Sequence, residues 1–205
     1  MDVLLFGGSF NPPHIGHRHV VLSLIKQFPK SKVYICPNFI SPFKISETKF
    51  SKDEIWSLCN SEFAPLLSKS VILWDEEIKK DIVSYTIDTL QTLKVLEPNA
   101  SISLVIGEDN LRSFKEWKSY QMILEQIRFL VVIRRITEFP KPIPCPNEID
   151  SEKLVILDNP ILTVSSREIR NGSENDWKKY LLPNTIELLK SFHSTKKMQR
   201  TKQYE

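Results

Sequence analysis

The sequence of 205 residues is poor in cysteine and has no long apolar run. A helix that crosses a bilayer needs about 20 consecutive apolar residues, so we expect neither a membrane span nor a membrane partner. The acidic N-terminus leads directly into a strand pattern, which argues against a signal peptide. The cysteines are odd in number and lack C-x-x-C spacing, which favours a reducing cytoplasm over disulfide bonds or a zinc site; they are Cys36, Cys59 and Cys145.

A large excess of one charge is also absent. The chain has 28 basic and 25 acidic residues, which gives a formal net charge of +3. This balance argues against a dedicated nucleic-acid binder, but it allows a local basic pocket for a small anionic substrate. Hydrophobic residues make up 41% of the chain, so it can bury a sizeable core as one domain.

Glycine and histidine are scarce, and both are concentrated in one turn. Three of the five glycines lie between residues 7 and 16, and three of the four histidines lie nearby: His14, His17 and His19. An apolar run at residues 3–6 precedes this turn, and apolar residues of helical spacing follow it at 20–28. Glycine lets a backbone approach a phosphate closely, and a helix N-terminus presents unpaired N–H groups to an anion. Because His14 and His17 would share one face of the first helical turn, the pattern indicates chemistry on a phosphate.

Apolar strand patterns alternate with amphipathic helical patterns along most of the chain. The strand patterns lie at residues 3–6, 32–37, 71–74, 101–106, 129–133 and 153–157. This alternation predicts an α/β fold, a Rossmann-like doubly wound parallel sheet with helices on both faces. We expect a single domain over residues 1–193 that ends in a small helical part interrupted at Pro183, followed by a flexible basic tail over 194–205.

Two local patterns refine this prediction. Ser84 or Thr86 is expected to cap the helix that follows the third strand. The spacing of Leu111, Phe114 and Trp117 predicts a helix after the fourth strand. Ligands of such folds bind beyond the carboxyl ends of the strands, so the site is expected where these turns emerge.

A metal site is an alternative role for the histidines. His19 lies five residues after His14 and off the face that His14 and His17 share, and no carboxylate or cysteine completes a ligand set. We therefore expect no protein-bound metal. The sequence contains neither the G-x-G-x-x-G dinucleotide fingerprint nor the G-x-x-x-x-G-K-[ST] phosphate loop.

Residues 8–17 read G-S-F-N-P-P-H-I-G-H, which resembles the signature G-[ST]-F-[DN]-P-x-H-x-G-H of the HxGH nucleotidyltransferase superfamily at every specified position. Residues 165–170, S-S-R-E-I-R, resemble its second signature, [ST]-S-[TSA]-x-I-R, although alone they would indicate an ordinary helix cap. The resemblance implies attack of a substrate phosphate on the α-phosphorus of a nucleoside triphosphate, with positioning and charge stabilisation as the means of catalysis. It assigns phosphate-binding or catalytic roles to His14, His17, Lys44, Arg170, Gly8, Ser9, Phe10, Ser165 and Ser166.

Three further segments resemble nicotinate-nucleotide adenylyltransferases. They are S-Y-T-I-D-T-L at 84–90, G-E-D at 107–109 with Leu111 and Trp117 downstream, and Y-L-L-P at 180–183. The resemblance implies that Trp117 stacks on the pyridinium ring and that Thr86 binds the nicotinate carboxylate. It also assigns Gly107 and Asp109 to ATP, and Tyr85 and Lys118 to the nicotinate nucleotide.

The implied reaction converts nicotinate mononucleotide and ATP into deamido-NAD and pyrophosphate in the cytoplasm. Mg²⁺ is expected to arrive with ATP. The expected partners are these substrates and no nucleic acid, and the oligomeric state, a homo-oligomer included, stays open. A nicotinamide-mononucleotide or dual-specificity adenylyltransferase is one alternative. An inactive nucleotide- or RNA-binding protein on the same scaffold is an alternative of another class.

Three residues depart from the family pattern. Phe43 replaces the histidine of a P-P-H-K loop, Arg167 stands where a small residue is usual, and Lys118 stands where an aromatic residue or histidine is common. Phe43 removes a polar contact near the triphosphate. Lys118 either favours an anionic substrate or is simply solvated.

Overall fold

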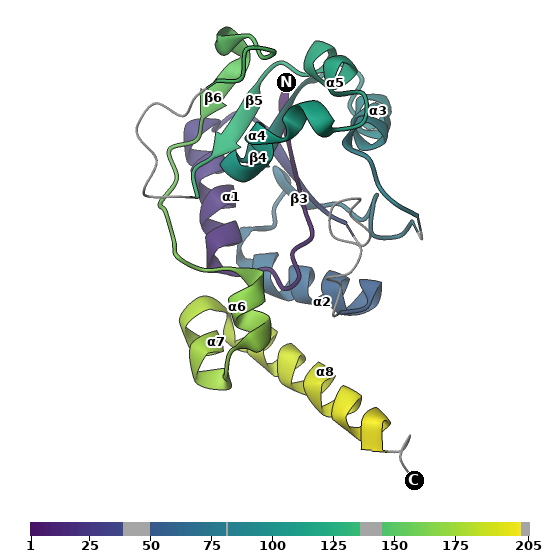
Figure 1. The fold of residues 1–205 in the computed structure, drawn as a ribbon, viewed down its shortest axis with the longest axis vertical. Helices are drawn as coiled ribbons and strands as arrows, with labels where there is room; N and C mark the ends of the chain where they lie inside the picture. The colour runs from purple at the N-terminus through teal and green to yellow at the C-terminus, as the bar shows by residue number, and fades with distance from the viewer. Residues whose placement is uncertain (39–49, 81, 136–144, 202–205) are drawn as a thin grey trace.

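A six-stranded parallel sheet forms the centre of the protein (Figure 1). The computed structural model describes residues 1–38, 50–80, 82–135 and 145–201. The strand order is β3-β2-β1-β4-β5-β6. The strands are β1 (Asp2–Gly8), β2 (Lys32–Pro37), β3 (Val71–Leu73), β4 (Ser101–Gly107), β5 (Leu130–Ile133) and β6 (Leu154–Ile156). All six strand patterns of the sequence are confirmed, and the order reverses between β1 and β4, which is where doubly wound sheets bind ligands.

Helices cover both faces of this sheet (Figure 1). Leu4 and Phe6 of β1 pack in one core with α1, α2 and the C-terminal helices, whereas Val3 and Leu5 pack in a second core with α3, α4 and α5. The doubly wound α/β fold is therefore confirmed. The helices are α1 (Ile15–Gln27), α2 (Lys52–Phe63), η1 (Ala64–Leu66), α3 (Thr86–Leu96), α4 (Glu108–Arg112), η2 (Phe114–Glu116), α5 (Tyr120–Gln126), η3 (Ser151–Lys153), α6 (Ser166–Asn171), α7 (Glu174–Tyr180) and α8 (Pro183–Thr201). Within the described ranges, no helix is both long and apolar enough to cross a membrane.

The small C-terminal helical part consists of α6, α7 and α8, at the lower end of Figure 1. The fully buried Glu62 of α2 joins this part to helices α1 and α2, because it accepts the backbone N–H of Leu182 at 3.0 Å and lies 2.9 Å from Nε of Arg18 on α1. Pro183 begins α8, as the sequence indicates. The expected tail starts inside α8, which continues as helix to Thr201 because residues 194–201 contain no glycine or proline.

Two expectations about helices are wrong. The N-cap of α3 is Tyr85, whose side chain makes no capping bond; helix α3 starts at Thr86, and the Ser84 hydroxyl is buried instead. Trp117 lies just beyond η2 in extended backbone, not on a helix with Leu111. The chain instead breaks at Ser113 between α4 and η2, and η2 ends before Trp117, so the spacing of three does not reflect one continuous helix.

Candidate active site

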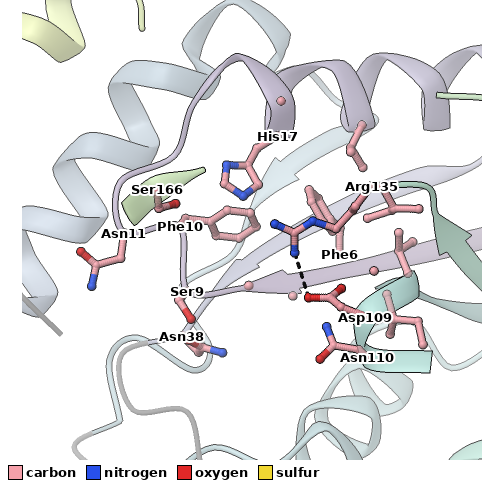
Figure 2. Close-up of a pocket in the computed structure, with 18 of the residues that line it drawn as sticks. Phe6, Ser9, Phe10, Asn11, His17, Asn38, Asp109, Asn110, Arg135 and Ser166 are labelled. Atoms are coloured by element: carbon pink, nitrogen blue, oxygen red, sulfur yellow. Dashed lines mark hydrogen bonds and ion pairs between the residues drawn. The ribbon is translucent and has the colours of Figure 1, made fainter. Parts of the chain in front are cut away.

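The carboxyl ends of β1, β4 and β5 open into a cavity of about 960 Å³ (Figure 2). Its size suits a small-molecule site, and it lies where the strand order reverses. The cavity brings together most of the candidates from the sequence: Gly8, Ser9, Phe10, His14, His17, Tyr85, Thr86, Gly107, Asp109, Trp117, Lys118, Ser165, Ser166 and Arg170. Lys44 and Phe43 lie outside the described residues.

The turn after β1 is held tightly by one aromatic side chain. Phe10 has left-handed backbone, with φ of 40°, and is 2% exposed. Its ring makes edge contacts with the rings of Phe6, His17 and Phe63. A Cβ atom on Gly8 would lie 3.0 Å from the Phe10 ring, so this close approach favours glycine. A strained backbone fixed by surrounding packing is common at functional sites.

The two histidines of the first signature stack at the start of α1. Their ring centroids are 3.8 Å apart, with 33° between the planes. Nδ1 of His14 accepts the backbone N–H of Gly16 at 3.2 Å, and Nδ1 of His17 accepts the backbone N–H of His14 at 3.2 Å. A neutral imidazole with an accepting Nδ1 carries its proton on Nε2. The backbone therefore fixes both rings in the form whose Nε2–H can donate to a ligand.

His14 is held in the neutral form. Burial first, and then the positive charge of Arg135, lower the pKa of His14 from 6.5 to about 3. Both causes act against the protonated ring. At physiological pH, His14 therefore offers a hydrogen bond to a phosphate but no positive charge.

The second signature braces the first. Ser165 caps α6 in a reciprocal arrangement with Glu168, whose N–H donates to Ser165 Oγ at 3.2 Å. Ser166 Oγ donates to the carbonyl oxygen of Pro12 at 2.8 Å, and Nη1 of Arg170 donates to that of Asn11. In the structure, two of the candidate phosphate-binding side chains thus hold the backbone of the turn that carries the histidines.

The end of β4 presents a carboxylate to the cavity. A Cβ atom on Gly107 would lie 2.2 Å from Oδ1 of Asp109, so a larger residue would displace this carboxylate. Oδ2 of Asp109 lies 3.0 Å from Nη1 of Arg135, which reaches in from beyond β5 (Figure 2). Oε1 of the buried Glu108 accepts the backbone N–H of Arg135 at 2.7 Å and so fixes the backbone position of Arg135.

A second group of candidates lies near the start of α3. Trp117 packs on Phe114 with ring centroids 5.2 Å apart. Lys118 Nζ lies 4.2 Å above the Tyr85 ring and 3.5 Å from a carboxylate oxygen of Asp88. Trp117 Nε1 is buried and has no hydrogen-bond partner among the described residues. The Lys118 side chain is 49% exposed, so it is half solvated and also lies over an aromatic ring of the cavity.

Sequence reasoning missed several charged residues of the cavity, among them Arg135 and Glu77. Arg135 is the second residue after the buried strand β5, and the pair of arginines at this strand end was the available signal. Glu77 also lines the cavity, and its Oε1 accepts the Thr89 hydroxyl of α3 at 2.6 Å. Burial raises the pKa of Glu77 to about 6, while the bond from Thr89 acts to lower it. Nothing in its local sequence distinguishes Glu77 from the neighbouring acidic residues.

The part of the chain that the structure describes contains no group of three histidine, cysteine or acidic side chains placed to hold a metal ion. The donors around the first turn are N–H groups of the two imidazoles and of the backbone, which suit phosphate oxygens.

Comparisons with known proteins identify the family of the chain. Residues 5–172 match the cytidylyltransferase-like family. A protein of Leptospira interrogans named "Probable nicotinate-nucleotide adenylyltransferase" is 37% identical over 172 residues, which cover 82% of this chain and 83% of the relative. A protein of the same name from Fusobacterium nucleatum is 33% identical over 177 residues, which cover 85% of this chain and 89% of the relative.

A solved structure has the same fold. The Plasmodium falciparum nicotinic acid mononucleotide adenylyltransferase complexed with NaAD superposes with a TM-score of 0.74 at 22% identity, covering 93% of this chain and 95% of that one. The same enzyme complexed with APC gives a TM-score of 0.71 at 21% identity, covering 94% and 96%. The chain therefore belongs to the cytidylyltransferase-like family and, within it, to the nicotinate-nucleotide adenylyltransferases.

Proposed function

We propose that this chain transfers the adenylyl group of ATP to nicotinate mononucleotide and so produces deamido-NAD and pyrophosphate. A phosphate oxygen of nicotinate mononucleotide attacks the α-phosphorus, a new P–O bond forms, and the bond to the oxygen that leads to the β-phosphate breaks. The observation that carries this proposal is the stacked pair His14 and His17, whose backbone bonds favour Nε2–H donors in the cavity. The names of the relatives support the same activity.

The contribution of the chain to this step is orientation and charge stabilisation. The imidazole N–H groups of His14 and His17 would donate to triphosphate oxygens, together with the backbone N–H groups of Gly8, Ser9 and Phe10. Donors that are fixed before the reaction stabilise developing charge without reorganisation. Lys44, Ser165, Ser166 and Arg170 are proposed to complete the phosphate site.

The nicotinate nucleotide is proposed to bind near the start of α3. Trp117 would stack on the electron-poor pyridinium ring, and Thr86, the first residue of α3, would bind the carboxylate with its N–H or hydroxyl. Tyr85 and Lys118 would line this end of the cavity. Gly107 and Asp109 would bind the ATP nucleoside, with Asp109 accepting from a ribose hydroxyl.

Mg²⁺ is proposed to arrive bound to the triphosphate, where it would neutralise charge on the pyrophosphate leaving group. The proposed compartment is the cytoplasm, which the three free cysteines support. No nucleic-acid partner is proposed.

The direct test supplies purified protein with ATP, Mg²⁺ and nicotinate mononucleotide. We expect deamido-NAD and pyrophosphate to form in equal amounts. His17→Ala is expected to lower kcat by about 100-fold or more, with a smaller change in KM, because its donor acts mainly in the transition state. His19→Ala, on the same helix but not part of the cavity lining, is the matched control and should keep its activity. No pyrophosphate release with the wild-type protein would contradict the proposal.

A further inference from the structure

Arg135 occupies a bridging place in the cavity. Its backbone is fixed just beyond β5 by the carboxylate of Glu108, and its guanidinium reaches Asp109 in the first turn of α4, with 3.0 Å between Nη1 and Oδ2. Figure 2 shows the side chain of Arg135 between Asp109 and the ring of His17. A Cβ atom on Gly107 would lie 3.2 Å from Cδ of Arg135, so the side chain runs closely over this glycine.

The positive charge of Arg135 acts at the end of the cavity where His14 and His17 lie. It is the second cause, after burial, that lowers the pKa of His14. The guanidinium is therefore close enough for its charge to act on His14, and Figure 2 shows it near the ring of His17 while its ion pair is with Asp109.

The neutral His14 adds no positive charge to those that Lys44, Arg170 and Mg²⁺ are proposed to bring to the triphosphate. ATP brings several negative charges, whereas the neutral imidazole of His14 supplies a hydrogen bond alone. Arg170, the candidate cation of the second signature, already donates to the carbonyl oxygen of Asn11. Arg135 lines the same cavity and is 47% exposed at its side chain, so a ligand can reach it.

We propose that Arg135 is a further phosphate-binding residue, which leaves Asp109 for the triphosphate when ATP binds. This inference rests on the proposed function of the cavity. The exchange has a second consequence, because it frees the Asp109 carboxylate to accept hydrogen bonds from the ribose hydroxyls. ATP would thereby provide new polar partners for both Arg135 and Asp109.

The exposure of the pair makes this exchange feasible. The Asp109 side chain is 50% exposed, and an ion pair in contact with water contributes little net stability. An arginine bonded to phosphate instead makes charge-assisted hydrogen bonds, often two in parallel, in a cavity that excludes part of the water. The balance therefore favours the phosphate once ATP is present.

The chain offers a closely matched control. Nη1 of Arg128 lies 2.8 Å from Oδ1 of Asp2, with side-chain exposures of 50% and 45%, so this ion pair resembles the first in geometry and exposure. It lies at the opposite end of the sheet, where β1 begins and just before β5. Arg128→Ala therefore removes an equivalent arginine without touching the cavity.

The experiment measures binding of two probes by calorimetry: inorganic tripolyphosphate, and an ATP analogue with a non-cleavable bridge between the α- and β-phosphorus. Arg135→Ala is expected to weaken both probes by about 10- to 100-fold, with partial rescue by Arg135→Lys, while Arg128→Ala has no effect. Asp109→Asn is expected to bind tripolyphosphate more tightly than the wild type, because Arg135 no longer has a partner to leave.

The outcomes separate this inference from the proposed function. If the protein does not adenylylate nicotinate mononucleotide but shows the expected binding pattern, the Arg135 inference holds and the proposed function is wrong. Equal probe affinities for the Arg135→Ala and Arg128→Ala variants would overturn the inference, even in an active enzyme. So would an Asp109→Asn variant that binds tripolyphosphate less tightly than the wild type.

Discussion

At the scale of single residues, the imidazole of His14 serves both the fold and the proposed chemistry. Its Nδ1 caps α1 by accepting the N–H of Gly16, and the same bond directs the ring proton to Nε2. Burial and Arg135 keep this ring neutral. The bonds that start the helix therefore also prepare the hydrogen-bond donor.

The lowered pKa of His14 predicts a pH dependence of stability. The folded state holds this pKa at about 3, against an ordinary value of 6.5, so the unfolded chain binds the proton more readily. The stabilisation is complete above pH 6.5 and is lost as pH falls toward 3, at a rate of up to about 1.4 kcal/mol per pH unit. Asparagine also caps helices, so His14→Asn is expected to lessen the fall in unfolding free energy between pH 7 and pH 5. Denaturant titrations at both pH values measure the unfolding free energy. An equal fall between pH 7 and pH 5 in the wild type and in His14→Asn would contradict this prediction.

The absence of a side chain at Gly107 is predicted to determine the position of the Asp109 carboxylate. Because an added Cβ would lie 2.2 Å from Oδ1 of Asp109, Gly107→Ala must displace the carboxylate. Affinity for ATP is expected to fall by about 10- to 100-fold, as misplaced binding groups typically cause. Gly7→Ala is the matched control, since a Cβ there meets its nearest atom, the Cys36 carbonyl oxygen, at an ordinary 3.9 Å. Equal affinities of the two variants for ATP would show that Asp109 is not involved.

At the scale of secondary-structure elements, the segment after β3 supports the start of α3. Glu77 accepts the hydroxyl of Thr89, which is 2% exposed on the inner face of α3. This bond helps to place Thr86 at the cavity, three residues earlier on the same helix. Burial is the largest cause of the raised pKa of Glu77 and Glu76 adds to it, and together they outweigh Thr89 and Lys80, which act to lower it.

The raised pKa of Glu77 predicts the opposite pH trend from that of His14. The folded state retains the proton up to about pH 6, whereas a free carboxyl of ordinary pKa 4.5 loses it earlier. This contribution to stability is complete below pH 4.5 and is lost as pH rises through 6. Glu77→Gln keeps an acceptor for Thr89 and removes the titration. The unfolding free energy of this variant, relative to the wild type, is expected to increase between pH 4.5 and pH 6.5; a constant difference would contradict the prediction.

The contrast between strands and helices explains what the sequence could predict. The six strands are apolar runs between polar turns, so their positions follow from local pattern. The first signature likewise lies within ten consecutive residues. The helical prediction for Trp117 was wrong because a spacing of three does not show where a helix ends: α4 ends at Arg112, and Trp117 follows η2 in extended backbone. Arg135 and Glu77 were missed because their roles depend on Asp109 and Thr89, which only the folded chain brings near.

At the scale of the whole molecule, the reversal of strand order between β1 and β4 assembles the site from distant segments. The turn after β1, the end of β4 and the start of α6 are separated by long stretches of chain, yet all of them line one cavity. The buried Glu62 joins α1 and α2 to the C-terminal helices, so these helices are a structural part of the domain. Which nucleotide the cavity accepts therefore depends on all of these segments together.

The most direct test of the account is the ratio of kcat/KM for nicotinate mononucleotide to that for nicotinamide mononucleotide, measured as pyrophosphate release with ATP and Mg²⁺. The two substrates differ only in a carboxylate against a carboxamide, so the ratio measures recognition of the carboxylate, which Thr86 is proposed to bind. The account predicts at least about a 100-fold preference for the acid, as expected where a site is built to bind a charged group. Equal values for the two nucleotides, or a preference for the amide, would contradict it.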